Sequence, residues 1–123
     1  MFEITYNGII TVNRGDSFEM PLIINSGSTM NPVKFTLTNR TNVYFGVMEP
    51  NQPFECALIK KKYTLEDCDE DGNIVVKFKP QDTQCVLPGK YYYQVKVQTF
   101  NSEDPEDYDV STVIDKTQFY IQE

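Results

Sequence analysis

Alternation of apolar and polar residues with a period of two is the dominant pattern along this chain. Such alternation is typical of strands that bury one face and expose the other. Pro21 interrupts one of these segments and cannot donate a ladder hydrogen bond, so that strand is expected at a sheet edge or at a bulge. The pattern predicts strands over 3–12, 17–24, 33–38, 43–47, 56–64, 74–79, 90–99 and 110–121.

Helical periodicity is nearly absent, and only one short helical turn is expected, within 81–87. Seven or eight short strands with one wet face favour antiparallel sheets in a sandwich or barrel. The sequence contains no linker, repeat or low-complexity segment, and 101–109 is its most loop-like stretch. We therefore expect one domain over 1–123.

The segment from Leu87 to Tyr93 leads out of a Pro-Gly turn into a strand. A tyrosine soon after the glycine is similar to the tyrosine corner that opens strand F of immunoglobulin-type sandwiches. Tyr91 would then hydrogen-bond back across the corner, near Asp82, after the turn at Gly89. A plain strand start that carries a tyrosine is the alternative. The predicted fold is an all-β, immunoglobulin-like antiparallel β-sandwich of seven to eight strands with no disulfide.

The net charge of −7 predicts long-range repulsion of nucleic acids and anionic membranes, so neither is expected as a partner. The one basic patch, Lys60–Lys62, is expected to be a solvated edge that discourages aggregation. No apolar run is long enough for a transmembrane helix, and Met1–Ile4 does not resemble a secretory signal.

Histidine is absent, which removes the commonest general base and the commonest metal ligand. We expect no enzymatic activity, no catalytic residue and no cofactor, although a carboxylate-based enzyme is not excluded. The three cysteines, Cys56, Cys68 and Cys85, lack C-x-x-C spacing. They are expected to be free thiols, some of them buried as small apolar residues.

The acidic segment around Asp67, Asp69 and Asp71 resembles the first half of an EF-hand loop. Such a loop ends on a bidentate glutamate, but Phe78 stands at that position, so an EF-hand is rejected. A hairpin turn with an acidic tip is the main interpretation, and these three aspartates remain weak calcium candidates.

In an immunoglobulin-like topology, the loops 25–32, 65–73 and 100–109 would lie at one end of the sandwich. Two of these loops are densely acidic and would repel each other unless a cation or a basic partner lay between them. We expect this end to meet a divalent ion or a basic neighbour. The acids are Glu66, Asp67, Asp69, Glu70, Asp71, Glu103, Asp104, Glu106, Asp107 and Asp109.

Arg14-Gly15-Asp16 contains the tripeptide that integrins bind. The favoured interpretation is a tight turn in which Gly15 takes a positive φ and Asp16 or Ser17 holds the turn through side-chain bonds. The tripeptide then belongs to the scaffold.

Several stretches together resemble short immunoglobulin-like proteins of phage virions, similar in style to the N-terminal domain of phage baseplate upper proteins. The resemblance covers nearly the whole chain; Cys85 and the long acidic loop 101–109 depart from the pattern. The stretches are Thr11–Ser17, Leu58–Lys62, Asp82-Thr83, Leu87–Tyr93 and Thr112–Ile121.

The resemblance implies a virion structural protein that is made in the host cytoplasm. We expect a capsid auxiliary or decoration protein that binds the major capsid protein or itself; a baseplate or tail component is the alternative. A calcium-dependent adhesion module and a carbohydrate-binding sandwich are weaker alternatives, and the absence of tryptophan counts against the latter. Tyrosine is favoured in interface cores, so the candidate anchors are Tyr44, Phe45, Tyr92 and Tyr108.

Overall fold

Ten β-strands, one α-helical turn and two 3-10 turns make up the described part of the computed structural model. The described residues are 2–4, 8–22, 25–27, 32–34, 38–68, 70, 73–101, 103–104 and 106–123. The elements are β1 (Phe2–Ile4), β2 (Ile10–Asn13), β3 (Phe18–Leu22), β4 (Asn25–Gly27), β5 (Pro32–Lys34), β6 (Thr41–Met48), η1 (Phe54–Cys56), β7 (Ile59–Tyr63), η2 (Leu65–Asp67), β8 (Ile74–Phe78), α1 (Pro80–Thr83), β9 (Gly89–Phe100) and β10 (Tyr108–Gln122).

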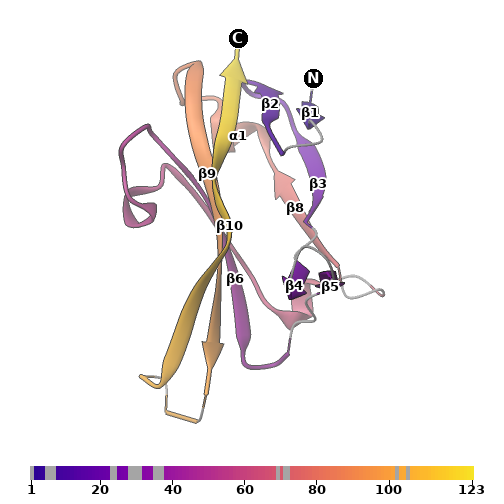
Figure 1. Ribbon diagram of the computed structural model, residues 1–123. Helices are drawn as coiled ribbons and strands as arrows, with labels where there is room; N and C mark the ends of the chain where they lie inside the picture. Colours follow the sequence, from indigo (N-terminus) through magenta and orange to yellow (C-terminus); the bar gives the residue numbers. More distant parts are fainter. Residues whose placement is uncertain are drawn as a thin grey trace.

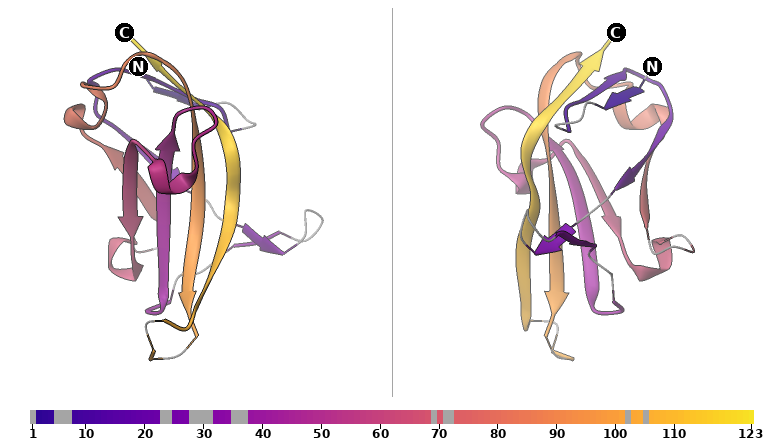
Figure 2. Two further views of the ribbon diagram at one scale, coloured as in Figure 1. Left: turned by 90° about the vertical axis from the view of Figure 1, so that its left-hand side faces the viewer. Right: turned by 45° about the vertical axis from the view of Figure 1, so that its right-hand side comes forward.

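The largest sheet has six strands in the order β1-β2-β10-β9-β6-β7. All its neighbours are antiparallel except β2 and β10, which run parallel. The pair β3–β8 faces one side of this curled sheet, and the magenta segment that contains η1 lies on the other side (Figures 1 and 2). The fold is therefore all-β, and all three cysteines are free thiols.

The core lies between the large sheet and the β3–β8 pair. Phe45 is its central ring: it stacks on Tyr93 with centroids 5.5 Å apart and meets Phe78 edge-on at 5.8 Å. Because side chains alternate across a strand, each strand contributes every second residue to this core. The buried apolar cluster is Ile10, Val12, Met20, Leu22, Val43, Phe45, Val47, Ile59, Ile74, Val76, Phe78, Tyr91, Tyr93, Val95, Val97, Phe119 and Ile121.

The structure differs from the predictions at two strands and one loop. The predicted strand 56–64 begins only at Ile59 as β7, because Cys56 ends η1. The segment 3–12 is an antiparallel hairpin of β1 and β2 rather than one strand, with Gly8 at a φ of +86° in the connection. The strand β4 occupies the start of the predicted loop 25–32 and pairs with β5. The predicted strand ends at 23–24 and 35–37 lie outside the described residues.

Pro21 lies in β3, which pairs only with β8 among the described strands, as expected for an edge. The predicted helical turn is α1, which begins one residue earlier than the expected segment.

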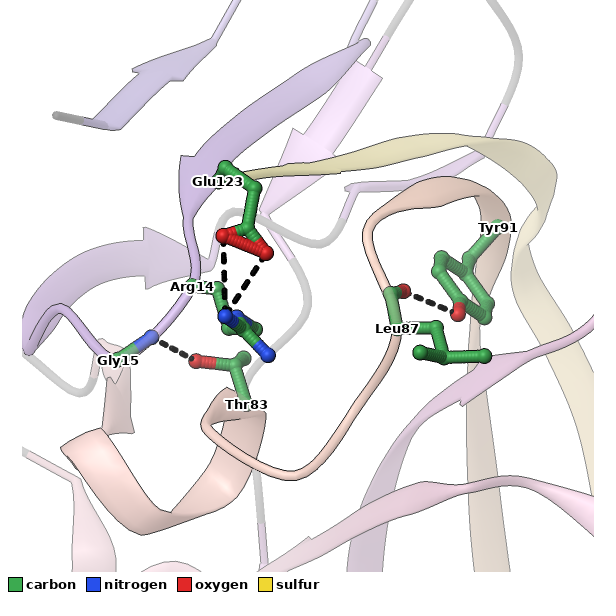
Figure 3. Close-up of polar contacts among 6 residues, drawn as sticks. All are labelled: Arg14, Gly15, Thr83, Leu87, Tyr91 and Glu123. Carbon is green, nitrogen blue, oxygen red and sulfur yellow. Dashed lines mark hydrogen bonds and ion pairs between the residues drawn. The ribbon is translucent and has the colours of Figure 1, made fainter.

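The tyrosine corner is present, but its partner is not the expected one. The Tyr91 hydroxyl donates to the Leu87 carbonyl at 2.5 Å (Figure 3). Asp82 pairs instead with Lys61. Burial, and then the negative charge of Glu49, raise the pKa of Tyr91, so its hydroxyl stays a donor. Gly89 begins the strand at a φ of +158°, which L side chains rarely adopt.

We expect Tyr91→Phe to lower the free energy of unfolding by about 1–2 kcal/mol, because the ring stays while the part-buried bond to the Leu87 carbonyl is lost. Urea denaturation measures the change. Tyr108→Phe is the matched control: Tyr108 is 46% exposed, and its change should stay within about 0.5 kcal/mol. Equal effects of the two substitutions would argue against a corner bond.

The Arg14-Gly15-Asp16 turn is tied into the scaffold. Gly15 has a φ of +82°, as predicted, and its N–H donates to the buried Thr83 hydroxyl at 2.8 Å (Figure 3). The Arg14 guanidinium lies 2.7 Å from the Glu123 carboxylate, and the Arg14 backbone N–H donates to the Gln122 carbonyl at 2.7 Å. These bonds join the β2–β3 turn to α1 and to the end of β10.

Candidate protein-binding face

The outer face of the large sheet is built from the residues between the core positions of β6, β7 and β9. Tyr44 on β6 stands directly between Lys62 on β7 and Lys96 on β9 in the strand register. Cross-strand neighbours on one face lie about 5 Å apart, so these three side chains form one row. The next row joins Lys60, Gly46 and Gln94.

A groove of about 400 Å³, open to solvent, crosses this face. Three aromatic rings contribute to it from different elements: Tyr44 from β6, Phe54 from η1 and Tyr108 from β10. The Tyr108 ring is itself held edge-on against Phe100, with centroids 5.9 Å apart. The lining is Tyr44, Phe54, Glu55, Lys60, Lys96, Gln98, Tyr108 and Val110.

Phe54 reaches the sheet because Gly46 leaves room for it. A Cβ atom at Gly46 would stand 2.6 Å from the ring carbon Cε2 of Phe54, so any larger residue would displace the ring. The Lys60 and Lys96 ammonium groups lie 5.8 Å and 5.1 Å from the centre of the same ring. Cation–π attraction at this range holds both charges at the groove.

The polar groups of the groove are arranged around Gln98. Its Oε1 accepts hydrogen bonds from the Tyr44 hydroxyl at 3.1 Å and from Asn42 Nδ2 at 3.2 Å. Lys60 Nζ donates to the Glu55 carbonyl at 3.2 Å. Tyr44 is therefore fixed in orientation, while the two ammonium groups keep unused donors.

The charge of this face is opposite to that of the whole chain. The strands β6, β7 and β9 contain no aspartate or glutamate, although the chain has 18 of them. Among the described residues, no carboxylate forms an ion pair with any lysine of these strands except Lys61. The lysines are Lys60, Lys61, Lys62, Lys90 and Lys96.

Lys61 has a different role from its two neighbours. Its side chain turns inward, is 18% exposed, and reaches Asp82 at 2.6 Å and the Phe78 ring at 5.3 Å. The prediction of a solvated edge therefore holds for Lys60 and Lys62 only. An inward charge on an edge strand discourages pairing with another strand, which limits this edge as a docking site.

Three of the four predicted anchors lie on the outer face. Tyr44 and Tyr108 line the groove, and Tyr92 stands half-buried farther along β9, with the Lys90 ammonium 5.5 Å from its ring centre. Phe45 is a wrong prediction: it is 0% exposed, because consecutive residues of a strand point to opposite faces.

Phe54, Lys60 and Lys96 were missed as members of the groove. A signal for the lysines was present in the sequence. Lys60 and Lys62 in one strand, and Lys90 and Lys96 in another, occupy positions between the residues that face the core. Phe54 gave no such signal, because it comes from a non-strand segment.

Of the three calcium candidates, Asp67 lies among the described residues. Its carboxylate accepts the Thr64 N–H at 2.7 Å and the Thr64 hydroxyl at 3.2 Å, which caps η2. Asp69 and Asp71 lie outside the described residues. Elsewhere, the described part contains no group of three acidic, histidine or cysteine side chains placed to hold a metal.

The acidic hairpin end and η2 both lie toward the end of the molecule opposite to the termini (Figures 1 and 2). The carboxylates of Asp107 and Asp109 accept hydrogen bonds from the Asn101 amide, at 3.5 Å and 3.0 Å. The described acids of this end are Glu66, Asp67, Glu70, Glu103, Asp104, Glu106, Asp107 and Asp109.

The cysteines are less buried than expected. Cys56 and Cys85 are exposed, and only Cys68 is partly buried against the core.

No protein-family model matches the chain, and no similarity to a curated protein or to a solved structure was found. The described helices include none that is long and apolar enough to cross a membrane. The resemblance to phage proteins therefore depends on the sequence motifs alone.

Proposed function

We propose that this chain is a non-enzymatic structural protein of a bacteriophage particle with an immunoglobulin-like sandwich fold. The proposed location is the capsid, where it acts as an auxiliary or decoration protein that binds other virion proteins. The motif resemblance along nearly the whole chain supports the virion assignment.

The strand order supports the immunoglobulin-like part of the proposal. In variable-type sandwiches one sheet contains G, F, C and C′ as neighbours, and strands B and E belong to the other. Here β10-β9-β6-β7 are neighbours in the large sheet, and β3 and β8 form the facing pair. The Tyr91 bond to Leu87 at the entry to β9 corresponds to the corner at strand F.

The observation that carries the protein-binding role is the aromatic and lysine-lined groove on the outer sheet face. Tyrosine and phenylalanine are enriched at interface cores, and charged side chains at their rims. The orientation of Tyr44 by Gln98 favours binding, because a fixed side chain loses little entropy when a partner covers it.

Mass spectrometry on gradient-purified particles, with heads and tails separated, tests the proposal. We expect this chain in the head fraction at high copy. Recovery with tails at low copy would move the assignment to a baseplate or tail component. Its absence from both fractions would overturn the virion assignment and leave the calcium-dependent and carbohydrate-binding modules to be tested.

A further inference from the structure

We propose that the outer-face groove binds an extended acidic segment of a partner protein. The segment would seat an apolar side chain among Tyr44, Phe54 and Tyr108 and direct its carboxylates to Lys60 and Lys96. This inference rests on the proposed protein-binding function and names the chemistry of the partner.

The lysines of the outer face favour an acidic partner. The three strands that form the face contain lysines and no acids, in a chain whose net charge is −7. The groove itself is lined by two lysines, Lys60 and Lys96, against one acid, Glu55. Lys60 and Lys96 are drawn to one ring, at 5.8 Å and 5.1 Å from its centre, instead of spreading into solvent. Two cations held together in this way repel each other, and an incoming carboxylate relieves that repulsion.

The exposed apolar surface of the groove favours a partner with an apolar side chain. Its lining includes the three aromatic rings and Val110, whose side chain is 52% exposed. Tyr108 is 46% exposed, so this end of the groove presents apolar surface to water. Covering both residues with an apolar side chain is favourable because it removes this apolar surface from water.

A peptide segment fits these groups better than a saccharide. A sugar platform needs a bare ring face with free polar groups beside it. Here the lysine ammonium groups lie over the Phe54 ring, and the Gln98 carbonyl already accepts two hydrogen bonds. The β7 edge beside this face is a poor docking site for a strand, since inward-pointing Lys61 protects it.

A long polyanion such as single-stranded nucleic acid also suits lysines and aromatic rings. Tyr108 lines the groove directly beyond the hairpin tip, which carries Glu103, Asp104, Glu106 and Asp107. These acids repel a polyanion that continues past the groove, whereas a short acidic segment can stop before them.

Fluorescence anisotropy with a labelled synthetic peptide of alternating glutamate and leucine tests the inference. We expect the full chain to bind this peptide, and binding to be lost near 1 M salt, where the screening length is about 3 Å. Lys60→Glu/Lys96→Glu should weaken binding at least about tenfold, because two charge pairs become repulsive. Phe54→Ala should also weaken it while leaving all charges in place.

Lys77→Glu/Lys79→Glu is the matched control, since it changes the net charge equally but alters exposed lysines at the end of β8, in the pair that faces the opposite side of the large sheet (Figure 1). Thermal unfolding checks that every variant is folded. Equal binding by both double variants would overturn the inference, as would tighter binding of an oligothymidine probe than of the peptide.

Self-association of the chain without peptide, abolished by Lys60→Glu/Lys96→Glu, would also overturn it in favour of a second copy as occupant. Peptide binding does not depend on particle location, so failure here is separate from failure of the virion assignment.

Discussion

Phe45→Ala should destabilise the protein by about 3–5 kcal/mol, the usual cost of truncating a fully buried aromatic ring. Phe45 is 0% exposed and contacts both Tyr93 across the sheet and Phe78 on the facing pair. The cavity would therefore open at the centre of the contact between the two layers. Urea denaturation of the purified variant measures the loss.

Tyr44→Ala is the neighbouring control, because the two residues differ by one position and by the face they occupy. Tyr44 is half-buried on the outer face, so its removal should cost about 1 kcal/mol or less in stability. The same variant should weaken binding of the acidic peptide. A large stability loss for Tyr44→Ala and a small one for Phe45→Ala would mean that Tyr44, and not Phe45, faces the core.

The strands were predictable where one face is buried without interruption. In β9, Tyr91, Tyr93, Val95 and Val97 are all buried, and the residues between them are not. A strand packed on one side must show this alternation, so the sequence carries it locally. The prediction failed at 3–12, where a turn divides two strands that share the same alternation.

Which of the two adjacent aromatic residues of β6 is buried was predictable from the alternation of that strand, but not from the residue types. Tyr44 and Phe45 are equally plausible anchors as isolated residues. The parity of the strand decides between them, since Val43, Phe45 and Val47 form the alternating apolar set. Tyr44 then falls on the polar face, and applying the alternation at this position would have removed Phe45 from the candidates.

The groove could not be derived from sequence because it depends on distant pairings. The strands that form it are neighbours in the order β10-β9-β6-β7, which is not their order in the chain. The register brings Lys62, Tyr44 and Lys96 into one row, and a shift of one residue would move each side chain to the other face. The Lys60–Lys62 patch was visible in the sequence, but the position of Lys96 in the same row as Lys62 follows only from the pairing of β6 with β7 and β9.

The inward turn of Lys61 leads to the second large effect. Asp82→Ala should lower the free energy of unfolding by about 2–3 kcal/mol, because two interactions end at one carboxylate. That carboxylate accepts from Lys61 Nζ at 2.6 Å and from the Lys79 N–H at 2.8 Å, where it caps α1. Its removal leaves a partly buried ammonium group without its ion-pair partner.

The same pair predicts an acid-dependent loss of stability. Burial raises the pKa of Asp82, but the hydrogen bonds from Lys61 and Lys79 outweigh it, so the net pKa lies below its ordinary value of 3.8. The folded state therefore binds this proton less readily than the unfolded chain. The stabilisation is complete above about pH 4–5 and is lost as the pH falls through the lowered pKa.

Unfolding measured from neutral to acidic pH distinguishes the contribution of the Lys61–Asp82 pair to stability from that of exposed ion pairs. The difference in stability between the wild type and Asp82→Asn should shrink as the pH falls below the ordinary aspartate range. Glu123→Gln is the control, because its partner Arg14 is 35% exposed and Glu123 itself 69%, so its loss should cost under about 1 kcal/mol.

Lys61→Met completes a double-mutant cycle with Asp82→Ala. Methionine keeps the apolar stem that covers the Phe78 ring, so the coupling reports the ion pair and not lost packing. We expect a coupling of about 1–2 kcal/mol at neutral pH that falls toward zero in acid. A coupling that does not change with pH would mean that the two side chains stabilise the edge through contact alone.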